Sequence, residues 1–541
     1  MVTVAAVQLK AYDVQDSQVA LEQALLMIDR AVEGKAQLVV LPECTFPGYF
    51  LGHKGYAEDA IMGLDEVISL FCDKAKQDKI YLIVGLPEVD EDKKIYNSAY
   101  LIGVEGEIIG IARKSLLWHF DREWFSEGDN QEVFNTSLGK IGMIVCADGR
   151  QPEISRILAL KGAEIIVDVT NLVATGNDDK HLANPQTEYM LPCRAFENKV
   201  WYVVSNKIGM EAESILFAGG SCIISPEGVK VGEASSYKQE IVTADIDLTL
   251  SNDKNSDSKF NAISDRNPSL YSVLTENIAT LPITEVLSEK VVPSKLSIFV
   301  SVVQMKEDIT FQQYLDKVSK IVPMMALQNS QLLVFPELKC TYQEDIQERL
   351  ASKMLDFAHQ YSLALVFSLL LSEGDKKYKT AVFVEPTGKI FSYKKTHLSS
   401  DEIETYNCGE ELPVFKTSLG KVGMMMGYEG FIPEVSRVLM LKGADLICWQ
   451  ANSSSNYHSF VVRTRSAENK VFLAVSDTWG KNSRGHSLIC NPGGAIVARA
   501  LHESNQIVSS QLELVSTRCK MVVTGTHIVN NRIPKVYNEL I

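Results

Sequence analysis

The strongest constraint on this chain is an internal repeat that covers most of its length. Without a gap, TSLGKIGMIVCADGRQPEISRILALKGAEIIV (Thr136–Val167) aligns with TSLGKVGMMMGYEGFIPEVSRVLMLKGADLIC (Thr417–Cys448), and more than half of the positions are identical. Three weaker pairs keep the same order: Val4–Lys10 with Val300–Lys306, Gln37–Thr45 with Gln331–Lys339, and Arg194–Gly209 with Arg465–Gly480. The period is that of a whole domain, so we expect a tandem duplication of one globular unit.

The length of the chain agrees with two domains. It has 541 residues, whereas a single hydrophobic core stops growing at roughly 250–300 residues. A polar, turn-rich stretch at 251–266 and the charged segment Glu289–Lys295 mark the region between the copies. We therefore expect a first domain over 1–277, a linker over 278–294 and a second domain over 295–541.

Composition narrows the class of protein. The formal net charge of −15 argues against non-specific binding to nucleic acid, which needs a basic face. No apolar run approaches the roughly 18–20 residues that span a bilayer, and the N-terminus lacks the pattern of a signal peptide. The ten cysteines are scattered without a C-x-x-C pair, which is typical of free thiols in a reducing compartment. We expect a cytoplasmic protein that binds neither nucleic acid nor membrane.

Apolar periodicity predicts alternating strands and helices in the first copy. Strands are expected at Leu38–Leu41, Tyr81–Val84, Ile108–Ala112, Ile141–Val145 and Val200–Val204. Helices are expected at Ser17–Val32, Glu66–Ala75 and Pro152–Lys161, the last with proline in its first turn and Gly162 at its end. This alternation predicts a layered α/β domain.

Three local patterns carry possible chemistry. Leu41-Pro42-Glu43 ends one strand, Arg113-Lys114 follows another, and Cys146 lies between a strand and a helix start. Each is ordinary alone, because strand-end carboxylates, basic turns and buried cysteines are common. Together, however, they place a carboxylate, a cation and a thiol at strand ends. A cysteine near a helix N-terminus and a lysine is expected to have a lowered pKa and to act as a nucleophile.

The order LPE, RK, VCADGRQPE, RAFENKVW, DRNPSLY resembles the carbon–nitrogen hydrolase (nitrilase) superfamily. The resemblance covers nearly all of the first copy and most of the second. It implies two tandem αββα sandwich domains and a Glu–Lys–Cys triad. By this resemblance Glu43 is the general base, Lys114 stabilises the oxyanion, Cys146 is the nucleophile, and the Ala147 N–H is a second oxyanion donor. No cofactor is implied, and the nine histidines show no metal-ligand pair.

Members of this superfamily usually carry a second glutamate after the lysine, ahead of a turn of the form F-x-x-G. Here LLWHFDREWFSEGD offers Asp121 and, two residues on, Glu123. Either carboxylate fits the role, and one of them could instead pair only with Arg122 or Lys114.

The resemblance also suggests pocket residues. Tyr49, Trp118 and Asn171 are candidates for substrate contacts, and Trp118 could equally serve packing. Arg150 is expected to be a structural ion-pair partner rather than a substrate ligand.

The second copy lacks the nucleophile. Glu337 and Lys395 keep the first two motifs, but Gly427 stands in the place of Cys146 and cannot form a covalent intermediate. We therefore expect an inactive second domain, retained as the partner of an intrachain pseudo-dimer. A further homo-oligomer, effector binding in the second pocket, and simple decay remain open.

The motif CADGR is closer to amidases and carbamoylases than to the C-W-E sequence of nitrilases. The resemblance therefore favours hydrolysis of a small-molecule amide or N-carbamoyl amide through a thioester, with release of ammonia or amine. Alternatives are a nitrilase that cleaves a small nitrile, and a non-catalytic small-molecule binding or scaffold protein. Cys146 separates these classes, because a binding protein needs no nucleophilic thiol there.

Overall fold

The computed structural model divides the chain into two compact units. Unit 1 contains Met1–Lys254 and Met521–Leu540, and unit 2 contains Asn255–Lys520 and Ile541. The structure describes residues 1–52, 61–175, 182–255, 261–288, 297–337, 344–452, 458–481 and 483–541.

Unit 1 is built on two β-sheets. The first has eight strands in the order β11-β10-β1-β2-β3-β4-β5, with β14 paired to β1. Its strands are β1 (Val2–Lys10), β2 (Leu38–Val40), β3 (Tyr81–Val89), β4 (Ile95–Ile102), β5 (Ile108–Arg113), β10 (Lys207–Glu211), β11 (Ile215–Ala218) and β14 (Glu240–Ile246). The second, in the order β13-β12-β9-β8-β7-β6, contains β6 (Val133–Thr136), β7 (Gly139–Val145), β8 (Ile165–Val169), β9 (Trp201–Ser205), β12 (Cys222–Ile224) and β13 (Lys230–Glu233).

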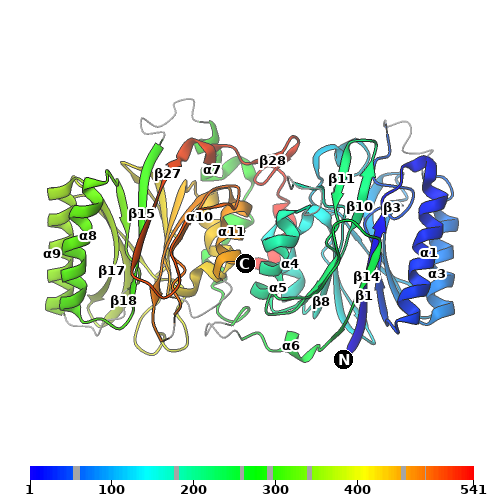
Figure 1. The fold of residues 1–541 in the computed structure, drawn as a ribbon, viewed down its shortest axis with the longest axis horizontal. Helices are drawn as coiled ribbons and strands as arrows, with labels where there is room; N and C mark the ends of the chain where they lie inside the picture. Colours follow the sequence, from blue (N-terminus) through cyan, green and yellow to red (C-terminus); the bar gives the residue numbers. More distant parts are fainter. Residues whose placement is uncertain are drawn as a thin grey trace. The chain divides into compact units, whose positions relative to one another are not determined.

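Helices cover the outer face of each sheet in unit 1, as Figure 1 shows. They are α1 (Ser17–Glu33) and α3 (Leu64–Asp78) on the first sheet, and α4 (Pro152–Leu160) and α5 (Leu191–Asn198) on the second. The alternation of strand side chains explains this packing. In β1, Val4 and Ala6 pack between the two sheets, whereas Ala5 and Val7 pack against the helices. The predicted αββα sandwich is confirmed. The short α6 (Thr249–Asn252) follows β14.

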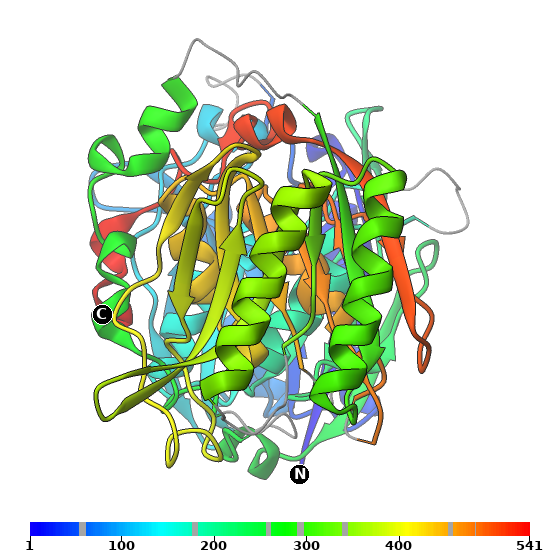
Figure 2. The same cartoon turned by 90° about the vertical axis from the view of Figure 1, so that its left-hand side faces the viewer.

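Unit 2 repeats this architecture. Its first sheet contains β15 (Ser297–Lys306), β16 (Leu332–Val334), β17 (Ala364–Glu373), β18 (Lys376–Val384), β19 (Ile390–Lys394), β24 (Thr478–Trp479) and β27 (Gln506–Glu513). Its second contains β20 (Val414–Thr417), β21 (Gly420–Met426), β22 (Leu446–Gln450), β23 (Phe472–Ser476), β25 (Leu488–Cys490) and β26 (Ile496–Arg499). Figure 2 shows α8 (Phe311–Leu327) and α9 (Glu344–Tyr361) lying over the first sheet. The helices that follow β21 and β22 are α10 (Pro433–Leu441) and α11 (His458–Asn469).

The tails of the two copies are exchanged between the units. Residues 255–288, which follow the first copy in sequence, belong to unit 2, and residues 521–540 belong to unit 1. The compact units therefore differ from the predicted division at residues 277 and 295. Part of the predicted linker is ordered structure, because α7 (Pro282–Ser288) buries Ile283 and Val286. Residues 289–294 of that linker lie outside the described residues.

Two general features of the described residues complete the fold. None of their helices has both the length and the apolar character needed to cross a membrane. Their cysteines are all free thiols, as the scattered sequence positions predict.

Candidate active site

Cys146 sits on a sharp elbow between β7 and the 3-10 helix η3 (Cys146–Arg150). Its φ is +53°, a left-handed conformation that costs an ordinary L-residue roughly 1–2 kcal/mol. Neighbouring side chains hold this conformation. The Cys146 N–H donates to Asp168 Oδ1 at 2.8 Å, and Gln186 Nε2 donates to the Cys146 carbonyl at 2.8 Å. Asp168 belongs to none of the sequence motifs and was not predicted. An acidic residue within the apolar strand β8 is the signal that could have identified it.

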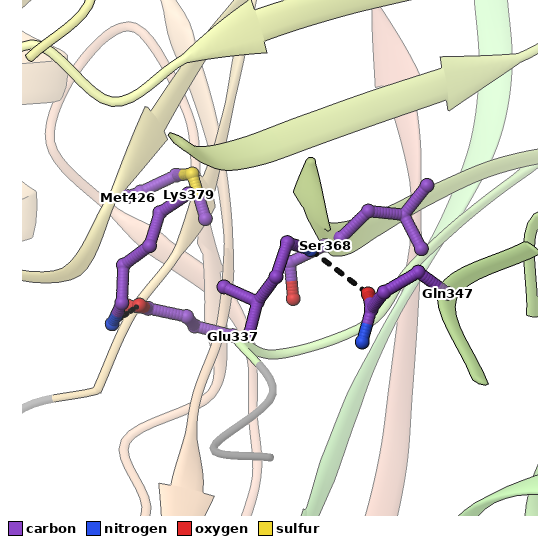
Figure 3. A pocket seen from close by; sticks show the side chains of 7 residues that line it. Glu337, Gln347, Ser368, Lys379 and Met426 are labelled. Carbon is purple, nitrogen blue, oxygen red and sulfur yellow. Dashed lines mark hydrogen bonds and ion pairs between the residues drawn. The ribbon is translucent and has the colours of Figure 1, made fainter. Parts of the chain in front are cut away.

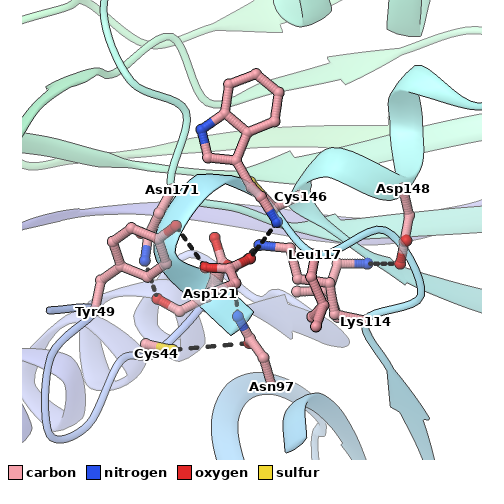
Figure 4. Close-up of polar contacts among 12 residues, drawn as sticks. Cys44, Tyr49, Asn97, Lys114, Leu117, Asp121, Cys146, Asp148 and Asn171 are labelled. Atoms are coloured by element: carbon pink, nitrogen blue, oxygen red, sulfur yellow. Dashed lines mark hydrogen bonds and ion pairs between the residues drawn. The ribbon is translucent and has the colours of Figure 1, made fainter. Parts of the chain in front are cut away.

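Glu43, Lys114 and Asp121 form a fully buried charged cluster beside the elbow. Figure 4 shows Lys114 and Asp121 of this cluster together with Cys146. Glu43 follows β2 and Lys114 follows β5, so the ends of two strands of the first sheet, separated by β3 and β4, deliver them. Lys114 Nζ lies 2.7 Å from Glu43 Oε1 and 2.7 Å from Asp121 Oδ2. Glu43 Oε2 is buried and has no hydrogen-bond partner in the part of the chain that the structure describes. The cluster therefore leaves one carboxylate oxygen of Glu43 available to a proton donor.

The structure distinguishes the two candidate carboxylates. Asp121 Oδ1 accepts from the Tyr49 hydroxyl at 2.8 Å, and Oδ2 accepts from the Trp118 N–H at 2.8 Å. Glu123, two residues on in the 3-10 helix η2 (His119–Glu123), is exposed and stands outside the cluster. Two residues of a 3-10 helix separate side chains by two-thirds of a turn, so only one of this pair can face the site.

Two asparagines orient Glu43. Asn97 Nδ2, from β4, donates to Glu43 Oε1 at 2.6 Å. Asn171 Nδ2, just beyond β8, donates to the Glu43 carbonyl at 2.9 Å and leaves its own Oδ1 without a partner. Asn171 was predicted near the pocket, whereas Asn97 was missed. Comparing the repeats at this point, Tyr96-Asn97-Ser98 against Tyr378-Lys379-Thr380, would have drawn attention to it.

Burial reverses the expected titration of the thiol. The pKa of Cys146 is raised above its usual value, first by burial and then by the negative charge of Glu43, while Lys114 opposes the shift. The prediction of a lowered thiol pKa is therefore wrong for the resting site, because desolvation outweighs the lysine. Burial alone would lower the pKa of Lys114. The negative charges of Asp121, Cys146 and Glu43 outweigh burial, so the pKa is raised well above normal and Lys114 stays protonated.

Arg150 lies over Trp118, and no carboxylate among the described residues pairs with it. Its Nε donates to Gln186 Oε1 at 3.1 Å, and its guanidinium carbon is 4.9 Å from the centroid of the Trp118 ring. Burial lowers the pKa of Arg150. The structural ion pair predicted for Arg150 is not found among the described residues. A desolvated guanidinium therefore lies close to Cys146.

Asp148 ties the elbow to the lysine segment. Its Oδ1 accepts the N–H groups of Ser115 at 3.0 Å and Leu116 at 2.7 Å, and its Oδ2 accepts the Val145 N–H at 3.2 Å. The two segments that carry Cys146 and Lys114 are thereby fixed to one another. In the described residues, no group of three or more His, Cys, Asp or Glu side chains is arranged to hold a metal ion.

The corresponding place in unit 2 has a different charge pattern. Gly427 occupies the elbow with a φ of +54°, close to that of Cys146. Lys379, in the position of Asn97, lies 2.6 Å from Glu337 Oε1 (Figure 3). It also lies 2.6 Å from Glu402 Oε1. Lys395 pairs with Glu402 Oε2 at 2.7 Å. Two lysines here neutralise two glutamates, whereas one lysine faces two carboxylates in unit 1.

Comparison with known proteins agrees with the repeat. The sequence pattern of the carbon–nitrogen hydrolase family matches residues 3–253 and again residues 299–519. A nitrilase of Pyrococcus abyssi is 33% identical over 248 residues, which are 45% of this chain and 90% of the relative. An omega-amidase of Xenopus laevis, NIT2-B, is 30% identical over 237 residues, which are 42% of this chain and 83% of the relative.

Amidases also occur among the similar proteins. An (R)-stereoselective amidase of a Pseudomonas species is 32% identical over 218 residues, covering 40% of this chain and 75% of the relative. A solved amidase from Nesterenkonia sp. matches with a TM-score of 0.41 and 25% identity, covering 47% of this chain and 92% of that one.

Proposed function

Because the chain belongs to the carbon–nitrogen hydrolase family, we propose that its first copy hydrolyses an amide or N-carbamoyl amide of a small molecule through a thioester on Cys146. The observation that carries this proposal is the free, buried Oε2 of Glu43 in the cluster that shifts the pKa of Cys146. A buried carboxylate oxygen without a partner is costly, and a proton-transfer role explains it.

The proposed mechanism begins with proton transfer from Cys146 to Glu43, since the raised thiol pKa makes an internal base necessary. The thiolate forms a bond to the carbonyl carbon. Lys114 and the Ala147 N–H stabilise the oxyanion; N–H groups in the first turn of a helix have no partner within it. The C–N bond then breaks as Glu43 protonates the departing amine.

The second half of the reaction regenerates the thiol. Glu43 takes a proton from water, the hydroxide oxygen attacks the thioester carbon, and the carbon–sulfur bond breaks. The Cys146 sulfur recovers a proton from Glu43, and the product is a carboxylic acid, or a carbamic acid from a carbamoyl substrate. Asp121 balances the charge of Lys114 throughout and is the auxiliary carboxylate in this assignment.

Arg150 suggests which amides are accepted. Its guanidinium lies over the Trp118 ring, is near Cys146, and has no carboxylate partner among the described residues. A charge-assisted hydrogen bond is worth about 1.5–3 kcal/mol, so an anionic substrate group would bind there with a tenfold or greater advantage. We therefore propose an amide that carries a carboxylate at its other end.

The test is ammonia release from wild type, Cys146→Ala and Cys222→Ala, a matched variant of another buried cysteine in unit 1. The first substitution should abolish activity and the second should retain it. Activity that survives in Cys146→Ala would contradict the mechanism.

Substrate class is tested with matched pairs, such as succinamate against butyramide, together with N-carbamoyl amino acids and small nitriles. Wild type should prefer the acidic amide, and Arg150→Gln should lose at least tenfold of that preference. Activity on nitriles alone would replace the amide assignment with the nitrilase alternative. A protein that binds these compounds without turnover would support the non-catalytic alternative.

A further inference from the structure

The C-terminal segment of the second copy lies in unit 1 and contacts the segment that carries Lys114. It contains β28 (Met521–Val523), β29 (Thr526–His527) and the 3-10 helices η10 (Pro534–Val536) and η11 (Asn538–Leu540). Thr526 is fully buried, and its Oγ1 accepts the His119 N–H at 2.8 Å. The same hydroxyl lies 3.5 Å from the Leu117 carbonyl as a donor.

The approach of this segment to the lysine segment is close. Gly525, just before Thr526, has a φ of +80°, and a Cβ there would lie 3.2 Å from the His119 carbonyl oxygen. The contact is therefore made by backbone and by a short side chain, which leaves little freedom for His119 to move. His119 itself has a φ of +46°, a strained value for a residue other than glycine.

The backbone held by Thr526 leads directly to the charged cluster. Leu117 and His119 flank Trp118, whose N–H donates to Asp121 Oδ2 at 2.8 Å. That oxygen is the one that pairs with Lys114 at 2.7 Å. The Trp118 ring in turn lies under Arg150. The Thr526 hydroxyl thus contacts the turn that carries Trp118, whose N–H bonds the carboxylate of Asp121 and whose ring lies under Arg150.

The same segment also contacts the residues that follow the elbow. The Tyr537 hydroxyl donates to Gln151 Oε1 at 2.6 Å, and Arg532 Nε lies 3.4 Å from Glu153 Oε1. Gln151 stands between η3 and α4, one residue beyond the 3-10 helix that begins at Cys146. The segment therefore holds both the lysine side and the cysteine side of the site.

We propose that Thr526 is a positioning residue for the reaction of the first copy, supplied by the catalytically silent second copy. Its hydroxyl holds the turn at Leu117–His119 so that Asp121 and Lys114 keep their geometry. The expected effect of Thr526 on turnover rests on the proposed function. Its expected effect on the order of the turn rests only on contacts within unit 1.

Three full-length variants test the catalytic part. Thr526→Val removes the hydroxyl with little change of volume, Thr526→Ser restores it, and Thr517→Val removes another buried threonine hydroxyl, one that bonds Asp445 at 2.9 Å in unit 2. Loss of one hydrogen bond should lower kcat of Thr526→Val about tenfold with KM within twofold. Thr526→Ser and Thr517→Val should stay within twofold of wild type. Wild-type kcat in Thr526→Val, or an equal loss in Thr517→Val, would overturn the proposal.

Amide hydrogen exchange tests the structural part without a substrate. Peptides spanning residues 114–125 should exchange faster in Thr526→Val than in wild type and should be unchanged in Thr517→Val. Unchanged exchange in Thr526→Val would overturn the proposal. A wild type that releases no ammonia from any substrate would reject the proposed function, while the exchange result would still decide whether Thr526 orders the turn.

Discussion

The individual residues of the site explain why a buried thiol needs a base beside it. Burial and the charge of Glu43 both raise the pKa of Cys146, so the resting residue is a neutral thiol. Lys114 remains charged because Asp121 and Glu43 outweigh its desolvation. A free oxygen of Glu43 completes the set. In the mechanism proposed above, reactivity is therefore produced by proton transfer within the cluster rather than by a stored thiolate.

Labelling of Cys146 with iodoacetamide should reflect this raised pKa. Only the thiolate reacts, so a raised pKa moves the rate curve to higher pH. We expect the labelling rate of Cys146 to keep rising above pH 9, whereas a free thiol such as glutathione levels off near its ordinary pKa of about 8.5. Mass spectrometry of the Cys146 peptide measures the rate at each pH, and a plateau below pH 8 would refute the expectation.

Glu43→Gln supplies the control for that experiment. Because the negative charge of Glu43 raises the thiol pKa, its removal should shift the labelling curve to lower pH. Ammonia release should nevertheless be abolished, since the base is lost. A curve that moves to higher pH would contradict the electrostatic role of Glu43.

At the scale of single elements, the parts with local signals could be predicted. The helix α4 begins at Pro152 as expected, and α1 differs from its prediction by one residue, because periodicity and caps are local properties. Asn97 could not be predicted as a site residue from its own surroundings, because its contact with Glu43 joins two strands far apart in sequence. The exchange of residues 521–540 into unit 1 likewise has no local signal. The thiol pKa depends on burial, which the sequence motif does not show.

The 3-10 helix η2 makes a prediction that separates two neighbouring carboxylates. Asp121 faces Lys114 from this helix, whereas Glu123 is exposed. Asp121→Asn should lower kcat about a hundredfold, because the preorganised charge beside Lys114 is lost. Glu123→Gln, the matched control, should stay within twofold of wild type. Steady-state ammonia release measures both, and a larger loss in Glu123→Gln would reverse the assignment of the auxiliary carboxylate.

For the whole molecule, the two copies combine one fold with two different charge patterns. Unit 1 has Cys146 beside an acidic cluster, while unit 2 has Gly427 and a second lysine, Lys379. Burial raises the pKa of Glu402, but Lys395 and Lys379 outweigh it and lower the pKa to about 2. Glu402 therefore stays ionised beside the two lysines. Unit 2 therefore differs from unit 1 both at the elbow residue and in the charges around its glutamate, since Lys379 stands where unit 1 has the neutral Asn97. Each copy nevertheless contributes its C-terminal segment to the other unit. The sequence identity between the two copies does not show this exchange, which ties each unit to both copies.

The different charges around the elbow of unit 2 predict that a cysteine introduced at position 427 does not create a second active site. In a Cys146→Ala background, Gly427→Cys should leave ammonia release at the background level, below about 1% of wild type, because Lys379 pairs with Glu337 where the neutral Asn97 contacts Glu43 in unit 1. A side chain at position 427 would also begin 2.6 Å from Lys395 Nζ and 3.1 Å from Glu337 Oε2, and its φ of +54° disfavours a Cβ. Gly427→Cys alone, with Cys146 intact, should keep at least half of wild-type activity and so show that the substitution is tolerated. Substantial ammonia release from the double variant would instead mean that the second copy lacks only its nucleophile, and that its paired lysines and glutamates can still perform the proton transfers that unit 1 assigns to Glu43.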